Sequence, residues 1–141
     1  MIDNTFLLWL LGALFGSMLF FAVTVAPTVF RALTADQGGA FLRRFFPQYY
    51  LWGIVMASLC TLAALANPGN PLVLSCCAII LVLFVYARQL LMPRINRARD
   101  RSQRGDAAAA TQFKHLHLQS VVINAAQLIL LLYLALAIAW S

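Results

Sequence analysis

The sequence lacks glutamate, so its acidic residues are four aspartates, at positions 3, 36, 100 and 106. None of them lies inside a long apolar segment, and no two carboxylates are placed for acid–base catalysis. The chain also contains no glycine-rich phosphate loop, HExxH or GxSxG motif. We therefore expect no enzymatic activity. A proton-coupled transporter is disfavoured as well, because it needs an ionisable group inside the membrane and only His117 is placed there.

Cysteine is also scarce. The three cysteines, Cys60, Cys76 and Cys77, lie inside apolar segments. There they are typical of small packing residues rather than of disulfides or zinc ligands.

Charged residues of either sign make up 10% of the chain, against about 25% in a typical soluble domain. From His115 to Ser141 there is no fixed charge, and a helix needs about 20 apolar residues to cross a bilayer core. We predict one all-α integral membrane domain, residues 1–141, forming a four-helix transmembrane bundle. The Asn67-Pro-Gly-Asn70 turn makes the middle two spans an antiparallel hairpin. The predicted spans cover residues 4–30, 48–66, 71–92 and 115–140.

The connections carry helix-terminating signals. Thr34-Ala-Asp-Gln37 has the form of a capping box, and the aromatic residues and arginines after it predict a short interfacial helix ending before Pro47. Pro27 predicts a kink near the end of span 1, and Pro93 predicts an interruption after span 3. Asp106 is the expected N-cap of the last helix.

The basic residues set the expected orientation. All ten lie in or beside the first and third connections: Arg31, Arg43, Arg44, Arg88, Arg94, Arg97, Arg99, Arg101, Arg104 and Lys114. With four spans these connections share one side, and the termini and the 67–70 turn share the other. The positive-inside rule predicts an inner-membrane protein with cytoplasmic basic loops and periplasmic termini. The bilayer thus explains the net charge of +6, and we expect no nucleic-acid partner.

A polar stripe runs along the last span. His117, Ser120, Asn124 and Gln127 are spaced by three, four and three residues, so they share one helix face. Two interpretations stay open: interhelical hydrogen bonds that hold the bundle together, or a polar pocket open to the cytoplasm. Arg88, near the end of span 3, either extends to the lipid headgroups or faces the stripe and supplies a positive charge.

His117 is also the only candidate metal ligand on the stripe, because His115 points to the opposite side of the helix. A haem or copper site would need a second ligand from another subunit or from Met18, Met56 or Met92. We expect no cofactor and keep haem or copper as a minority alternative.

Gly12 and Gly16 form a GxxxG pair in span 1. Small residues at this spacing let a second helix approach closely. The partner is either another helix of the same chain or a second copy in a homo-oligomer.

Several short motifs occur together along the chain. They are Phe30-Arg31-x-Leu33, Phe46-Pro47-x-Tyr49, Arg88 followed by Pro93-Arg94, and Phe113-xxx-His117-xx-Ser120-xxx-Asn124. Over nearly its whole length the chain resembles the transmembrane protein 205-like family, whose bacterial members have no known function. The resemblance implies a four-span membrane protein and no particular activity. It marks Phe30, Arg31, Pro47, Tyr49, Pro93, Arg94 and Phe113 as motif positions.

Two functions therefore remain open from the sequence. The first is a non-enzymatic binding or conduit protein, with Arg88 and the stripe forming a pocket for a small ion, anion or lipid headgroup. The second is a structural or accessory membrane subunit, in which the same residues only pack.

Overall fold

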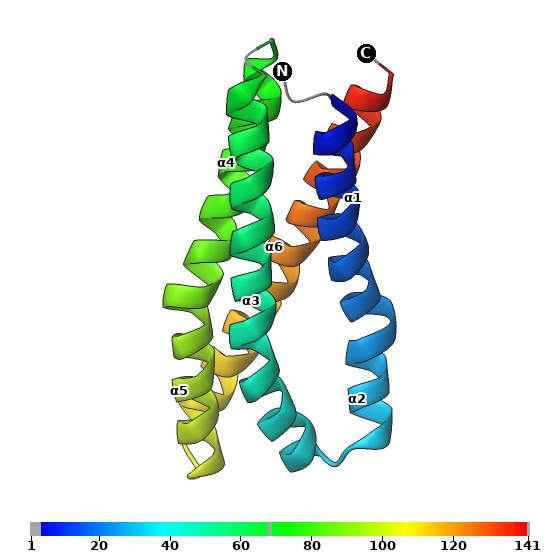
Figure 1. The fold of residues 1–141 in the computed structure, drawn as a ribbon. Coiled ribbons are helices and arrows are strands. Elements are labelled where there is room, and N and C mark those ends of the chain that lie inside the picture. The colour runs from blue at the N-terminus through cyan, green and yellow to red at the C-terminus, as the bar shows by residue number, and fades with distance from the viewer. Residues whose placement is uncertain (1–3, 68, 141) are drawn as a thin grey trace.

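The structure is a computed structural model that describes residues 4–67 and 69–140 (Figure 1). Within these residues the chain forms four long helical spans. Span 1 comprises α1 (Asn4–Phe20), the π-helical turn η1 (Phe21–Val25) and α2 (Ala26–Ala32), and span 2 is α3 (Ala35–Ala66). Span 3 comprises α4 (Pro71–Tyr86), the π-helical turn η2 (Ala87–Leu91) and α5 (Met92–Gln103), and span 4 is α6 (Ala107–Ala139). Each span is long and apolar enough to cross a membrane, so the predicted four-helix transmembrane bundle is confirmed.

The predicted interfacial helix between spans 1 and 2 is not a separate element. α3 begins at the Thr34 capping box, which is present as predicted, and continues through Pro47 to Ala66. Pro47 removes one backbone donor from the helix, but two pairs of aromatic rings, each with one residue before and one after Pro47, stack on each other. The rings of Phe45 and Tyr49 stack with centroids 5.9 Å apart, and those of Phe46 and Tyr50 stack at 5.6 Å.

Pro93 does not interrupt span 3, contrary to the sequence prediction. The preceding turn widens instead, and the Met92 N–H bonds the carbonyl of Ala87 five residues earlier. A wider turn relieves the clash between a proline ring and the carbonyl before it. The distortion expected at Pro27 takes the same form, since the Ala26 N–H bonds the carbonyl of Phe21.

The connections are tight. Asn70 caps α4 through its side-chain oxygen, which accepts from the backbone N–H groups of Leu72 and Val73. Pro68 of the predicted turn lies outside the described residues. Asp106 caps α6 as predicted, its carboxylate accepting from the Ala109 N–H at 3.0 Å. Figure 1 shows the end of α3, the start of α4, the start of α1 and the end of α6 at one end of the bundle, opposite the other two connections.

The core lies in the half of the bundle near the termini. α1 and α6 contribute leucines and a methionine that are fully buried: Leu11, Leu14, Met18, Leu131 and Leu134. α3 and α4 pack closely because the ring of the buried Phe84 lies against Gly53, where a Cβ would overlap it. The three cysteines are buried and free, in agreement with their predicted packing role.

Candidate functional site

The polar stripe of α6 does not act as one unit. Gln127 is only 2% exposed and donates its side-chain N–H to the carbonyl of Ile80 on α4 at 3.3 Å. Ser120 is half-buried and donates its hydroxyl to the His117 carbonyl of its own helix at 2.7 Å. The Gln127 bond joins two helices, as the packing interpretation requires, whereas the Ser120 bond stays within α6.

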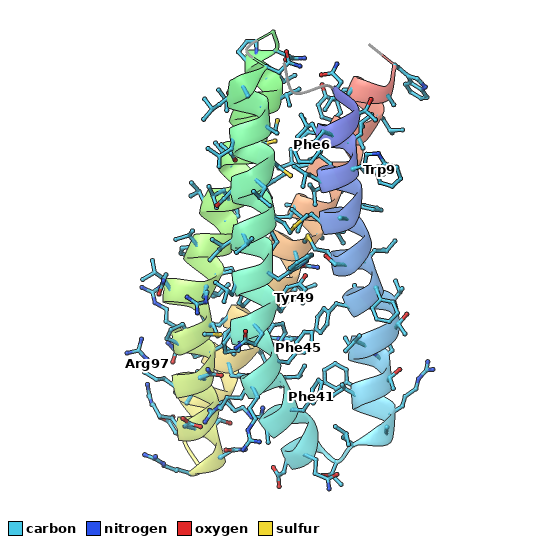
Figure 2. All side chains as sticks on the ribbon, viewed as in Figure 1. Phe6, Trp9, Phe41, Phe45, Tyr49 and Arg97 are labelled. Atoms are coloured by element: carbon cyan, nitrogen blue, oxygen red, sulfur yellow. The ribbon has the colours of Figure 1, made fainter. Side chains whose placement is uncertain are left out.

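Asn124 has a partner that the sequence did not indicate. The hydroxyl of Tyr49, on α3, donates to Asn124 Oδ1 at 2.8 Å. Tyr49 is 8% exposed and its ring lies 4.9 Å from that of Phe21, on η1. Figure 2 shows Tyr49, Phe45 and Phe41 along the side of α3 that faces span 1. The bond therefore joins spans 2 and 4 at the point where span 1 changes its helical form.

Arg88 is not part of the stripe. It is half-buried, and its Nε donates to the carbonyl of Pro47 at 3.4 Å. It thus packs against α3 beside the proline and lies apart from the cavities described next. α6 makes another polar contact that the sequence did not indicate. The side-chain N–H of Gln119 donates to the hydroxyl of Tyr86 on α4 at 3.0 Å.

Two adjoining cavities lie between span 1, α3 and α6, and we call them together the crevice. The upper cavity has a volume of about 230 Å³ and reaches Tyr49 and Asn124. The lower cavity has a volume of about 440 Å³ and reaches the first turn of α3 and the arginine-rich helix α5. Four side chains line both cavities: Phe30, Leu42, Phe46 and His117.

The crevice has apolar walls and one closed end. Ala22, Ala26 and Phe46 line its upper part, and the buried core of α1 and α6 extends from Met18 and Leu131 toward the termini. Phe30 is 66% exposed at the outer edge, so the crevice is open sideways. Among the described residues, the side chains that bring polar atoms into the upper cavity belong to Tyr49, Tyr50, His117, Ser120 and Asn124.

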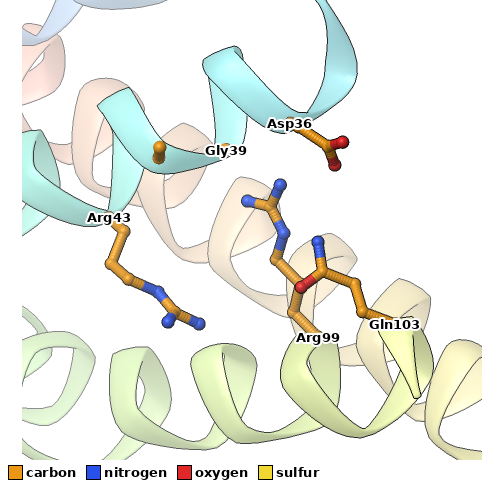
Figure 3. A pocket seen from close by; sticks show the side chains of 6 residues that line it. Asp36, Gly39, Arg43, Arg99 and Gln103 are labelled. Carbon is orange, nitrogen blue, oxygen red and sulfur yellow. The ribbon is translucent and has the colours of Figure 1, made fainter.

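The lower end of the crevice is basic. Arg43 and Arg99 line the lower cavity and also an open surface pocket with Asp36 and Gln103 (Figure 3). Arg43 is bound to Asp100 by a 2.5 Å ion pair. The sequence contained one sign of this arrangement, the Gly38-Gly39 pair inside a helix, because consecutive glycines there often mark a close approach of another group.

His117 does not have the neighbours of a metal ligand. Its ring stacks on Phe113 of the same helix, with centroids 6.0 Å apart. The residues that line the two cavities around it include no cysteine, methionine or second histidine. In the part of the chain that the structure describes, no three histidine, cysteine or acidic side chains are grouped as metal ligands. Within one chain, the side chains around His117 therefore supply no second ligand for haem or copper.

Gly12 and Gly16 point away from the bundle. A Cβ at either position would meet no heavy atom within 4 Å. The GxxxG pair thus does not bring α1 against another helix of the same chain.

Comparison with known proteins places this membrane protein in a family. Residues 9–104 match the family described as a domain of unknown function, DUF4149, and the chain belongs to that family. An uncharacterised protein of Aquifex aeolicus (strain VF5) is 30% identical over 87 residues, which is 62% of this chain and 64% of the relative. The chain thus spans less than two thirds of that relative's length. No solved structure matches the chain.

Proposed function

We propose that this protein is a non-enzymatic binding protein that holds a small membrane-derived ligand, such as a lipid headgroup with its adjoining chain, in the crevice. The observation that carries the proposal is the crevice itself, apolar along its walls, polar at Tyr49 and Asn124, and basic at its lower end. Ligand sites are typically concave, mostly apolar and furnished with a few convergent polar groups.

A conduit is less well supported by this geometry. Beyond the Tyr49–Asn124 bond, the buried side chains of α1 and α6 are apolar except Gln127, whose amide N–H is already bonded to the carbonyl of Ile80. An ion that crossed this part of the bundle would lose its hydration and gain few polar partners in exchange. Binding within one half of the bilayer needs no such passage.

We further propose that the protein lies in a cell inner membrane with the crevice facing the cytoplasm. The basic connections lie at the end of the bundle opposite the termini (Figure 1), and the positive-inside rule places such an end in the cytoplasm. The relationship to the transmembrane protein 205-like family also belongs to this proposal. Residues of its motifs line both cavities, among them Phe30 and Tyr49 in the upper one and Phe30 and Phe113 in the lower one.

Blocking the upper cavity tests the binding proposal. Ala22 lines that cavity, so Ala22→Trp fills it, whereas Ala13→Trp places the same ring on the exposed side of the same span. Native mass spectrometry of protein extracted in a neutral detergent would count the lipids that stay bound. We expect Ala22→Trp to lose bound lipid and Ala13→Trp to keep it. Equal retention by both variants would contradict the proposal.

The accessory-subunit function stays as a second candidate because Gly12 and Gly16 are exposed with open space around them. A second copy of this chain could approach closely at that surface. Chemical crosslinking in native membranes would test it, with Gly12→Leu expected to abolish a dimer band. A band of unchanged intensity would remove the GxxxG surface as the contact.

A further inference from the structure

The guanidinium group of Arg99 occupies a notch in α3. It lies so close to Gly39 that a Cβ at that position would overlap it. Figure 3 shows the group directed from α5 toward Gly39 and Asp36 on α3. Its Nη2 donates to the carbonyl of Ala35 at 3.2 Å. The missing side chain of Gly39 therefore lets a charge from α5 reach the lower cavity of the crevice.

Arg99 forms no ion pair with a described residue, unlike Arg43 and Arg101. Within the described residues, the ion pairs are Arg43 with Asp100 and Arg101 with Asp106. Asp36 shares the open pocket with Arg99 without pairing with it. A guanidinium has five N–H donors in a fixed fork. The hydrogen bond to the Ala35 carbonyl uses one of them, so the others can bind an anionic oxygen.

The crevice above the notch suits an apolar chain. Gly39 and Tyr49 are ten residues apart on α3, about 15 Å along the helix, and Leu42 and Phe46 line the interval. α3 has 32 residues, which gives it a length of about 48 Å, whereas the hydrocarbon core is about 30 Å thick. With Ala66 at one boundary of the core, the first turns of α3 extend past the other boundary. A charged group at the notch would thus lie at headgroup level while its chain entered the crevice.

We propose that the ligand of the crevice is an anionic membrane lipid whose phosphate group binds the Arg99 guanidinium at the Gly39 notch. The inference rests on the binding function proposed above and adds the chemical class of the ligand. Planar guanidinium groups bind phosphate oxygens through paired, charge-assisted hydrogen bonds. The open side of the crevice at Phe30 gives a lipid a direct path from the bilayer.

Matched variants separate this site from general attraction to a basic surface. Arg99→Gln removes the charge, and Gly39→Leu keeps the charge but displaces the flexible end of Arg99 from its notch. Arg97→Gln removes the same charge two residues away, where the side chain is exposed and points away from the bundle (Figure 2). Binding of phosphatidic acid and of phosphatidylcholine with identical chains would be titrated by native mass spectrometry in a neutral detergent, with inorganic phosphate as competitor.

We expect Arg99→Gln and Gly39→Leu each to weaken phosphatidic acid binding about tenfold, as for loss of a charged hydrogen bond. Arg97→Gln should change it less than about twofold, and phosphatidylcholine binding should be insensitive to all three variants. If both lipids bind equally and Arg99→Gln resembles Arg97→Gln, the notch assignment is wrong while the binding function stands. Displacement of the lipid by inorganic phosphate alone would show a free-anion site and overturn the lipid assignment. Failure of the wild-type protein to retain either lipid would overturn the binding function itself.

Discussion

Spans 1 and 3 contain the same distortion of the helix, but its surroundings differ. Each has a π-helical turn of five residues followed by an X-Pro pair: η1 with Ala26-Pro27, and η2 with Met92-Pro93. Both prolines open the same short pattern, Pro-x-(Val/Ile)-x-Arg-Ala, at residues 27–32 and 93–98. Yet none of the η1 residues is buried, whereas η2 buries Ala87 and Leu91.

The packing partners explain this difference. α5 lies along α6 as one side of a tight hairpin, and Figure 1 shows α2 standing away from α6 at the same level. A π-turn and its proline therefore do not decide whether a helix packs. In span 3 the widened turn belongs to the core, and in span 1 it forms the edge of the crevice. The same local structure is thus packed against its neighbours in span 3 and borders an open crevice in span 1.

The largest effect is expected where packing is closest. Gly53→Leu would force a side chain into the buried ring of Phe84, and overpacking of this kind costs about 3 kcal/mol or more. Gly12→Leu makes the same change where a Cβ meets only open space, and should cost less than about 0.5 kcal/mol. Thermal unfolding in detergent, followed by size-exclusion chromatography, measures both. A similar loss in the two variants would refute the division into packed and open regions.

The bond that closes the crevice should contribute less. Tyr49→Phe removes the hydroxyl that binds Asn124, and membrane hydrogen bonds contribute about 0.6–2 kcal/mol. Asn124→Leu removes the other partner. With the double variant, these changes form a double-mutant cycle, from which we expect an interaction energy between Tyr49 and Asn124 of about 1 kcal/mol. Coupling near zero would mean that the bond does not stabilise the bundle.

Asn124 should also matter for the ligand. We expect Asn124→Leu to leave the bundle folded and to abolish lipid retention, and His117→Ala to act likewise because both side chains line the upper cavity. A complementation assay adds a cellular measurement. Full activity of both variants at normal expression would show that the stripe only packs.

The sequence predicts those features of the fold and the site that depend on residues close together along the chain. The four spans, the Thr34 capping box and the Asp106 N-cap follow from local patterns, and all are present. The polar stripe was correctly placed on one helix, but the partners of Asn124 and Gln127 lie on other helices. Periodicity gives a direction on one helix and carries no information about which helix lies opposite.

The misplaced features have a similar origin. Pro47 and Pro93 are strong helix breakers in isolation, and the chain passes both because aromatic stacking and a π-turn accommodate them. For Arg88 the sequence left open the lipid headgroups and the stripe, whereas its Nε donates to the carbonyl of Pro47 on α3. Arg99 was not distinguished from the other arginines, because the notch at Gly39 exists only once α3 and α5 are packed together.

A smaller effect separates the two π-turns. Pro27→Ala and Pro93→Ala each return a backbone donor, and we expect stability changes of at most about 1 kcal/mol. η1 should close to a regular α-helix, because none of its residues is buried, and η2 should persist, because Ala87 and Leu91 are held in place. Backbone hydrogen exchange of residues 21–27 and 87–93 checks this. Closure of both turns, or of neither, would show that packing does not distinguish them.

The smallest effects concern the caps that begin α3 and α6. Thr34→Ala removes an exposed capping box and should cost about 0.5 kcal/mol at any pH between 3 and 8, since no titrating group is involved. Asp106 differs, because the backbone N–H of Ala109 and the guanidinium of Arg101 hold the pKa of its carboxyl below the ordinary value. A depressed pKa contributes stability that is present above the unfolded value, about 3.9, and is lost as the pH falls through the folded pKa. Asp106→Asn keeps a capping oxygen but not the charge, so its unfolding temperature should lie below that of the wild type at pH 7 and approach it in acid. A difference that stayed constant down to pH 3 would show that the Asp106 charge does not stabilise this connection.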